Sequence, residues 1–255
     1  MLTPELGSVS AVVFDFDGVF SDSRRLHDRA RAVAFARRAE ETGDDRYVTV
    51  PAEVHEASHL HGSTPNAIIG WVLQQVHLVD SDVDVDTNPV IMATVAHKRE
   101  VYKELARSGG IIVPGMPEVV RRLMPYLPGR LAIATTAERG CEVMPYLMSQ
   151  GLNRYFPDRL IVAKEDVDAV GGKPKPDPLV YEMAVERLGL TTVPETVLAI
   201  EDSLRGIESA NRAGLRVGAL ATTHTVEELQ QADGIQRPAF IARNPEHLSA
   251  ILGIG

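Results

Sequence analysis

The sequence predicts an α/β fold, in which a doubly wound parallel sheet carries an inserted all-helical domain. The first observation is that short apolar runs, typical of buried strands, alternate with segments of helical spacing. The second is that a long stretch after the first apolar run has no strand pattern. The expected strands are Ala11–Phe14, Leu131–Ala134, Leu160–Ala163, Val197–Ile200, Val217–Leu220 and Phe240–Ala242.

The segments between the later strands have apolar side chains at helical spacing. A strand that is followed by a helix and then by another strand favours parallel pairing, with helices on both faces of the sheet. The expected helices are Glu118–Tyr126, Cys141–Ser149, Leu179–Leu188 and Leu204–Ala213.

Residues 21–104 break this alternation and predict helices only. We therefore expect a core formed by residues 1–20 and 105–255, and a helical cap formed by residues 21–104. The chain passes between core and cap twice, near Ser21–Arg24 and near Gly109–Gly115. The second passage contains glycine and proline turn residues, and both passages are expected to act as hinges. The expected cap helices are Leu26–Glu41, Val54–Leu60, Asn66–Leu78 and Val90–Ser108.

The composition argues against several classes of partner. A formal net charge of -9 argues against nucleic acid, because phosphate backbones require basic surfaces. No apolar run approaches the roughly 18 residues of a membrane span, so no membrane partner is expected. Cys141 is the only cysteine, which excludes an intrachain disulfide and favours a reducing compartment. We expect a cytoplasmic monomer or weak homodimer without a signal peptide.

The segment Asp15-Phe16-Asp17-Gly18-Val19 follows the first predicted strand directly. Residues i and i+2 of a strand point the same way, so Asp15 and Asp17 are expected to face one site at the carboxyl end of the sheet. Paired carboxylates there can hold a hard cation, attack an electrophile or move a proton. The alternative is a strand-end cap followed by a solvated turn.

Thr135 and Thr136 follow the predicted strand Leu131–Ala134. A hydroxyl beside free backbone N–H groups can bind a phosphoryl oxygen. The alternative is an ordinary strand-end threonine that caps a helix.

Gly172-Lys173-Pro174-Lys175-Pro176-Asp177 places a lysine on a backbone stiffened by two prolines. Such a lysine can neutralise a transferred phosphoryl group and nearby carboxylates. The spacing favours Lys173 for the site and leaves Lys175 on the surface.

Glu201 and Asp202 follow the predicted strand Val197–Ile200. Together with Asp15 and the backbone carbonyl of Asp17, Asp202 would complete an oxygen site for Mg²⁺, with Glu201 as a direct or an indirect ligand. The alternative is that Asp202 only caps the helix that follows.

These four segments, in this order, resemble the four motifs of the haloacid dehalogenase superfamily. The helical cap resembles the subgroup of β-phosphoglucomutase and sugar phosphatases. The resemblance implies a Rossmann-like core and phosphoryl transfer through an aspartyl-phosphate that depends on Mg²⁺. The implied roles are nucleophile and metal ligand for Asp15, acid and base for Asp17, phosphoryl binding for Thr135 and Lys173, and metal binding for Glu201 and Asp202.

The resemblance also implies substrate contacts from the cap. His27 lies twelve residues after Asp15, as in the mutase-like proteins, and Lys98 resembles their second cap residue. The residues after His27 depart from the mutase pattern, since Arg31 follows Ala30 where those proteins have tryptophan. His61, Ser63 and Thr64 belong to a polar loop that resembles a specificity loop, although the serine or the threonine would equally suit a helix start.

The function predicted from these observations is hydrolysis of a small phosphorylated metabolite, a sugar or polyol phosphate, by a magnesium-dependent phosphatase. A phosphomutase of the β-phosphoglucomutase type is the first alternative, because it differs only in whether water or a sugar hydroxyl receives the phosphoryl group. A non-catalytic sugar-phosphate sensor is the more distant alternative.

Overall fold

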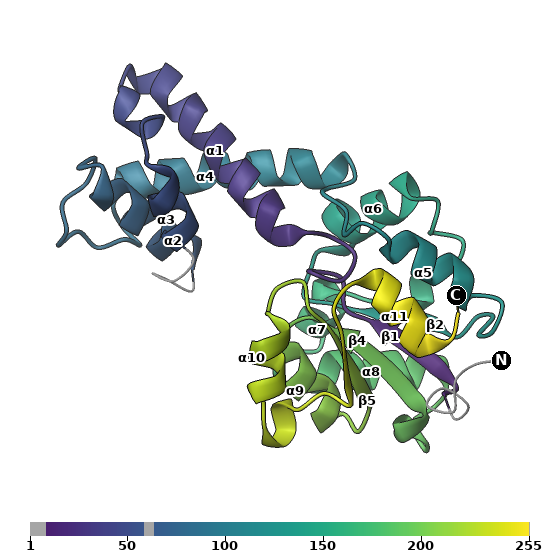
Figure 1. Ribbon diagram of the computed structural model, residues 1–255. Helices are drawn as coiled ribbons and strands as arrows, with labels where there is room; N and C mark the ends of the chain where they lie inside the picture. Colours follow the sequence, from purple (N-terminus) through teal and green to yellow (C-terminus); the bar gives the residue numbers. More distant parts are fainter. Residues whose placement is uncertain (1–8, 59–63, 255) are drawn as a thin grey trace. The chain divides into compact units, whose positions relative to one another are not determined.

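The computed structural model describes residues 9–58 and 64–254 and separates into two compact units (Figure 1). Met1–Ser23 and Arg107–Gly255 form the first, here called the core unit, and Arg24–Ala106 form the second, the cap unit. The division expected from the sequence lies within a few residues of these bounds.

The core unit contains a six-stranded sheet in the order β3-β2-β1-β4-β5-β6, and every pairing is parallel. This order is that of the doubly wound dinucleotide-binding folds, whose ligands lie outside the carboxyl ends of the strands where the strand order reverses. The reversal falls between β1 and β4 here. The strands are β1 (Ala11–Phe14), β2 (Leu131–Ala134), β3 (Ile161–Val162), β4 (Val197–Glu201), β5 (Arg216–Leu220) and β6 (Phe240–Ala242).

Helices cover both faces of this sheet, as the alternating sequence predicted (Figure 1). One face packs against α5 (Met116–Leu123), α6 (Met144–Ser149) and α11 (Pro245–Leu252). The other face packs against α7 (Lys164–Ala169), α8 (Leu179–Leu188), α9 (Leu204–Arg212) and α10 (Val226–Gln231).

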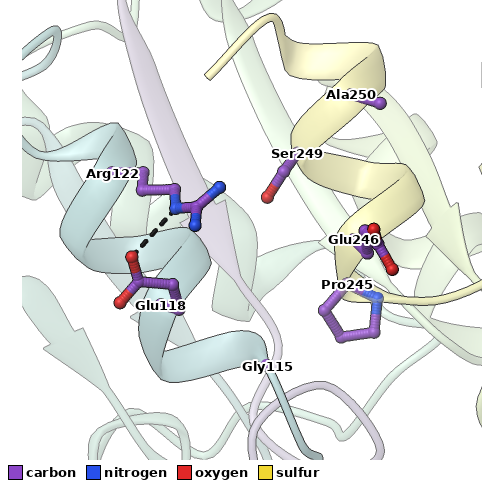
Figure 2. A pocket seen from close by; sticks show the side chains of 7 residues that line it. All are labelled: Gly115, Glu118, Arg122, Pro245, Glu246, Ser249 and Ala250. Atoms are coloured by element: carbon purple, nitrogen blue, oxygen red, sulfur yellow. Dashed lines mark hydrogen bonds and ion pairs between the residues drawn. The ribbon is translucent and has the colours of Figure 1, made fainter. Parts of the chain in front are cut away.

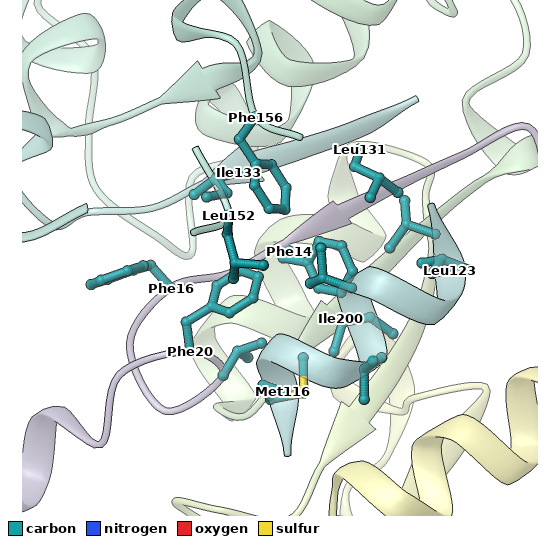
Figure 3. Packing of buried hydrophobic residues seen from close by; sticks show 14 of the residues in the cluster. Phe14, Phe16, Phe20, Met116, Leu123, Leu131, Ile133, Leu152, Phe156 and Ile200 are labelled. Carbon is teal, nitrogen blue, oxygen red and sulfur yellow. The ribbon is translucent and has the colours of Figure 1, made fainter. Parts of the chain in front are cut away.

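Alternate residues of each central strand belong to opposite cores. Val12 and Phe14 face the α5 side, and Ala11 and Val13 face the α8 side, which is why the strand is apolar throughout. On the α5 side, the rings of Phe14, Phe20 and Phe156 lie with centroids 5.3 to 6.1 Å apart (Figure 3). These contacts fix the chain immediately before and after the two aspartates.

The cap unit is helical, with a small core of its own. Its helices are α1 (Ser23–Thr42), α2 (Ala52–Ala57), α3 (Pro65–Gln75) and α4 (Pro89–Arg107), the first and last of which begin or end in the core unit. Its core consists of Phe35, Tyr47, Ile69, Val72, Leu73, Ile91 and Val95.

The main departure from the predicted elements lies at the helix expected over Cys141–Ser149. Arg139–Val143 instead forms a π-helical turn, and α6 begins only at Met144. Pro145 stands in the first turn of α6 and has no N–H to donate, so an α-helix cannot run through it from Cys141 with all of its hydrogen bonds. By contrast, α8 has the bounds that the sequence predicted.

The two chain crossings between core and cap are joined by backbone hydrogen bonds at the core end. The Val113 N–H donates to the Phe20 carbonyl at 2.8 Å, and the Asp22 N–H donates to the Ile111 carbonyl at 2.7 Å. Gly109 and Gly115 have φ of 102° and 94°, conformations that residues with a Cβ rarely adopt. Hinge motion at these crossings stays a prediction. In the described part of the chain, no helix is both long enough and apolar enough to cross a membrane.

Candidate active site

The sheet register brings three of the predicted segments together at one edge. Phe14 pairs with Ile133 of β2 and with Ile200 of β4, so the next residues, Asp15, Ala134 and Glu201, stand at the same level. Asp15 is bonded into this edge through its N–H, which donates to the Ile200 carbonyl at 2.9 Å. The carboxyl ends of these neighbouring parallel strands therefore form the floor of one site.

The lysine of this site is Lys175, which corrects the choice made from the sequence. The Lys175 side chain is buried, and its Nζ donates to Asp15 Oδ1 at 2.6 Å and to Glu201 Oε1 at 2.7 Å. Lys173 is exposed. The reason is that the Lys175 backbone is held against α9, where the Arg205 guanidinium donates to its carbonyl at 2.5 Å.

Glu201 is fully buried, and both of its carboxylate oxygens accept hydrogen bonds. Oε1 accepts from Lys175 Nζ and from the Tyr181 hydroxyl, each at 2.7 Å. Oε2 accepts from the N–H groups of Asp202 and Ser203 and from the Ser203 hydroxyl, at 3.1 to 3.4 Å. The carboxylate also lies where a side chain at Gly206 would be, since a Cβ there would stand 1.9 Å from Oε1. Glu201 is therefore held tightly between α8 and the start of α9.

Asp202 reaches the turn that follows Asp17. A Cβ at Gly18 would stand 1.7 Å from Asp202 Oδ2, and Gly18 has a φ of 69°, so both space and conformation require glycine there. The Thr223 hydroxyl donates to the same Asp202 oxygen, and the Thr222 hydroxyl donates to the Gly18 carbonyl at 2.5 Å. The loop after β5 thus fixes both the aspartate and the turn.

Asp15, Glu201 and Asp202 form a buried acidic group whose ligand oxygens all lie within 4.8 Å of one another. Burial, followed by the charge of Glu201, raises the pKa of Asp202 to about 8. Burial also raises the pKa of Asp15, and the charges of Glu201 and Asp202 add to this rise, while the charge of Lys175 opposes it. One buried ammonium does not balance three buried carboxylates. An oxygen-rich group with excess negative charge fits a hard divalent cation such as Mg²⁺.

Asp17 is half-buried, and its pKa is raised into the range in which a carboxyl gains and loses a proton near neutral pH. Removal from water, followed by the charge of Glu142 on the π-helical turn, raises the pKa of Asp17 to about 7. A hydrogen bond from Ser23 and the charge of Lys175 act in the opposite direction. A carboxyl with this pKa can both give and take a proton.

Thr135 is buried at the end of β2, and its Oγ1 accepts a hydrogen bond from the Ala137 N–H at 3.0 Å. This bond closes a turn after the strand and does not cap a helix, because the next helical element has Glu138 at its N-cap. It leaves the hydroxyl proton for another acceptor. Thr136 is exposed. Their phosphoryl or substrate contacts stay predictions.

In the cap unit, His27 and Lys98 come together from α1 and α4. Lys98 Nζ lies 2.8 Å from His27 Nδ1, and the His27 ring stacks on Tyr102 with centroids 4.4 Å apart. An ammonium only donates, so Nδ1 accepts and the ring proton lies on Nε2. Burial against its neighbours, followed by the charges of Lys98 and Arg31, lowers the pKa of His27. Because His27 is exposed overall, we attribute the lowered pKa chiefly to these two cations.

Of the remaining cap candidates, Thr64 lies at a helix start, and the other two belong to a segment outside the described residues. Thr64 is the N-cap of α3, and its hydroxyl accepts a hydrogen bond from the Ala67 N–H at 3.2 Å, which is the helix-start interpretation. His61 and Ser63 lie outside the described residues. A substrate role for these three residues stays a prediction.

A separate groove of about 400 Å³ lies between α5 and α11 (Figure 2). Its charged lining includes Arg122, which donates to Glu118 at 2.9 Å, and Glu246. None of its lining residues belongs to the acidic group at the strand ends.

The model of the haloacid dehalogenase-like hydrolase family matches residues 9–214, which include every motif of this site. The chain belongs to this family. It is similar to a phosphorylated carbohydrates phosphatase from Thermotoga maritima, with 27% identity over 81% of this chain and 82% of the relative. It is also similar to a β-phosphoglucomutase from Mycobacterium bovis, with 28% identity over 81% of this chain and 78% of the relative.

Among solved structures, a family hydrolase from Deinococcus radiodurans with bound phosphate and sodium has a TM-score of 0.70 and 23% identity, over 97% of each chain. A likeness at this identity shows the fold: an α/β core with a helical cap, as the sequence predicted.

Sequence reasoning missed three contributors to the site. Lys175 was passed over for Lys173, and Tyr181 was assigned no role beyond its helix. Thr223 was given no role. A usable signal for Thr223 was its position three residues after the end of β5, at the same edge of the sheet as the other motifs.

Proposed function

We propose that this hydrolase is a magnesium-dependent phosphatase that hydrolyses a small phosphorylated metabolite, a sugar or polyol phosphate, through an aspartyl-phosphate. The observation that carries the proposal is the buried ammonium of Lys175 bonded to Asp15, beside a carboxylate group that it does not neutralise. Phosphoryl transfer depends chiefly on positioning and charge neutralisation, and this arrangement supplies both. The phosphorylated carbohydrates phosphatase among its relatives supports the choice of substrate class.

In the first half-reaction, an Asp15 oxygen attacks the phosphorus while the bond to the leaving oxygen breaks. Asp17 gives its proton to the leaving alkoxide, which its raised pKa permits near neutral pH. Lys175 and the Thr135 hydroxyl bind the phosphoryl oxygens, and Lys175 takes over the role that the sequence had given to Lys173. The product alcohol leaves, and the phosphoryl group stays on Asp15.

In the second half-reaction, Asp17 accepts a proton from water while the water oxygen attacks the phosphorus. The bond from phosphorus to Asp15 breaks, inorganic phosphate leaves, and Asp17 is protonated again for the next cycle. Asp15, Asp202 and the Asp17 carbonyl would hold Mg²⁺, which supplies positive charge to the phosphoryl oxygens when bound. Glu201, whose oxygens already accept hydrogen bonds, would support the metal site indirectly.

The cap would select the substrate. His27, held by Lys98 as a donor through Nε2, suits a hydroxyl oxygen of a sugar or polyol. His61, Ser63, Thr64 and Thr136 are proposed as further polar contacts. A cytoplasmic location and a monomeric or weakly dimeric state remain our predictions.

A phosphomutase of the β-phosphoglucomutase type is the second candidate. The β-phosphoglucomutase among the relatives and the His27–Lys98 contact favour it. In a mutase, a sugar hydroxyl would replace water as the acceptor of the phosphoryl group from Asp15.

The test is a phosphate-release assay over sugar phosphates, polyol phosphates and p-nitrophenyl phosphate, with and without Mg²⁺. Release from one group of natural esters, dependent on Mg²⁺, supports the phosphatase. Conversion of a sugar 1-phosphate to its 6-phosphate that requires a bisphosphate, with little phosphate released, would instead establish the mutase. Absence of both activities across the panel would refute the proposal.

A further inference from the structure

The hydroxyl of Tyr181 lies inside the proposed active site, yet Tyr181 belongs to none of the four motifs. Its side chain projects from the first turn of α8 and is fully buried. The hydroxyl donates to Glu201 Oε1 at 2.7 Å and accepts from Lys175 Nζ at 3.2 Å. The ammonium also lies 4.7 Å from the centre of the Tyr181 ring. Tyr181 therefore contacts both partners of the Lys175–Glu201 ion pair.

The ammonium of Lys175 has more acceptors than protons. Asp15 Oδ1, Glu201 Oε1, the Ala134 carbonyl and the Tyr181 hydroxyl all lie within 3.2 Å of Nζ, which carries three protons. These acceptors compete, so the position of the ammonium depends on how strongly each one attracts it. The two carboxylates are the strongest competitors because they are charged.

The Tyr181 hydroxyl weakens the attraction of one of these carboxylates, Glu201, for the ammonium. By donating to Glu201 Oε1, it satisfies part of the charge that would otherwise draw Lys175 away from Asp15. Without the hydroxyl, Glu201 Oε1 would keep Lys175 as its one remaining donor among the described residues.

Glu201 itself has no room to adjust. Its second oxygen is held by Asp202, Ser203 and the helix start, and Gly206 packs directly against the carboxylate. If the Tyr181 hydroxyl were lost, the longer and more flexible Lys175 side chain would therefore move, and Glu201 would not. The Lys175 ammonium would move toward Glu201 and away from Asp15.

We propose that Tyr181 is a positioning residue: by donating a hydrogen bond to Glu201 Oε1, its hydroxyl keeps the Lys175 ammonium bonded to Asp15. This inference rests on the proposed function, since its consequence is for phosphoryl transfer: an ammonium displaced from Asp15 neutralises the transferred group less well. The ring alone does not provide this, because only the hydroxyl can donate to Glu201.

The test is Tyr181→Phe, with Tyr146→Phe as the matched control. Tyr146 is equally buried in the same unit, but its hydroxyl has no hydrogen-bond partner among the described residues. For Tyr181→Phe we expect kcat with p-nitrophenyl phosphate to fall about tenfold, with KM within about twofold, as for the loss of a hydrogen bond to a charged group. The control should keep the wild-type kcat. Equal kcat values for the two variants would overturn the inference.

A double-mutant cycle tests whether Tyr181 acts through Glu201. In a Glu201→Gln background, Tyr181→Phe should change kcat by less than about twofold, because the charge that attracts Lys175 is already gone. A purely structural role for Tyr181 predicts the same fold-loss in both backgrounds, and that result would overturn the inference.

A crystal structure of Tyr181→Phe supplies a readout that does not need turnover. We expect Lys175 Nζ beyond hydrogen-bonding distance of Asp15 in this variant and within it in Tyr146→Phe. If Nζ stays on Asp15 in both variants, the inference is wrong, whatever the activity. If the wild type releases no phosphate while Nζ moves as expected, the proposed function fails and the positioning by Tyr181 stands.

Discussion

Two lysines of this protein touch candidate functional groups in opposite surroundings. Lys175 of the core unit is buried and bonded to two carboxylates, whereas Lys98 of the cap unit is half-buried and contacts a neutral histidine nitrogen. In the core, Lys175 and Glu201 are each fixed by several buried partners, so small changes there should carry large penalties. In the cap, the contact between Lys98 and His27 is exposed to solvent, which suits a region that tunes substrate preference rather than chemistry.

The largest effect is expected from Asp15→Asn. The amide is nearly isosteric with the carboxylate but cannot attack phosphorus, so phosphate release should fall by at least about 10³-fold. Circular dichroism and thermal unfolding should show an intact fold, since Asn at this position also relieves the crowding of carboxylates. Asp82→Asn, at an exposed aspartate of the loop before α4, is the control and should retain activity. Near wild-type turnover of Asp15→Asn would rule out the covalent mechanism.

Removal of magnesium is expected to abolish turnover as well. Activity should vanish with EDTA and return with Mg²⁺, because the buried carboxylates need a cation that Lys175 alone does not replace. Undiminished activity after complete chelation would exclude the metal assignment.

The same site predicts how stability depends on pH. In the metal-free protein, Asp202 keeps its proton to about pH 8, while in the unfolded chain it loses it near pH 4. The folded state then binds more protons than the unfolded state over this window, so stability should fall as the pH rises through it. Mg²⁺ competes with those protons, and the rise in Tm on adding it should therefore be larger at pH 8 than at pH 5.5. An equal rise at both pH values would contradict a metal site at Asp202.

The next largest effect is expected at Lys175, and Lys173 of the same Lys-Pro-Lys-Pro segment provides the comparison. Lys175→Met removes the buried ammonium and should lower kcat/KM by about 10²- to 10³-fold, because transition-state charge is left unneutralised. Lys173→Met, two residues away on the surface, should change it by less than about twofold. Steady-state kinetics of the two variants on one substrate measures the difference, and a larger loss in Lys173→Met would restore the choice made from the sequence.

This pair also shows where sequence reasoning stops. The strands and the order of the motifs could be predicted, because buried parallel strands are apolar throughout and their ends must meet at one edge. The choice between Lys173 and Lys175 could not, because in Lys-Pro-Lys-Pro both lysines have the same local pattern. Burial decides it, and burial depends on how the segment is held against α9 by Arg205. The requirement for glycine at position 206 likewise depends on where the buried Glu201 carboxylate is held at the end of β4.

A moderate effect is expected from Gly206→Ala. In most helix interiors this change stabilises, but here the new Cβ would overlap the Glu201 carboxylate, so we expect a loss of about 1–3 kcal/mol and reduced activity. Gly140→Ala is the control, because a Cβ there meets no atom within 4 Å apart from its chain neighbours and the backbone of its own helical turn. Chemical denaturation of both variants checks this. A Gly206→Ala protein as stable as the wild type would mean that Glu201 is less tightly held than its contacts indicate.

The smallest effect on turnover is expected in the cap. Lys98→Met removes the ammonium that sets the His27 ring with its proton on Nε2, so the histidine should lose its fixed orientation without any change at Asp15. For a sugar or polyol phosphate we expect KM to rise about three- to tenfold, the size of a hydrogen bond to a hydroxyl. For p-nitrophenyl phosphate, which offers no polyol to His27, both kcat and KM should stay within about twofold. Lys103→Met, an exposed lysine of the same helix, controls for loss of charge from the cap. Equal losses on both esters would show that Lys98 serves the chemistry or the cap fold, and the separation of roles between the two lysines would then fail.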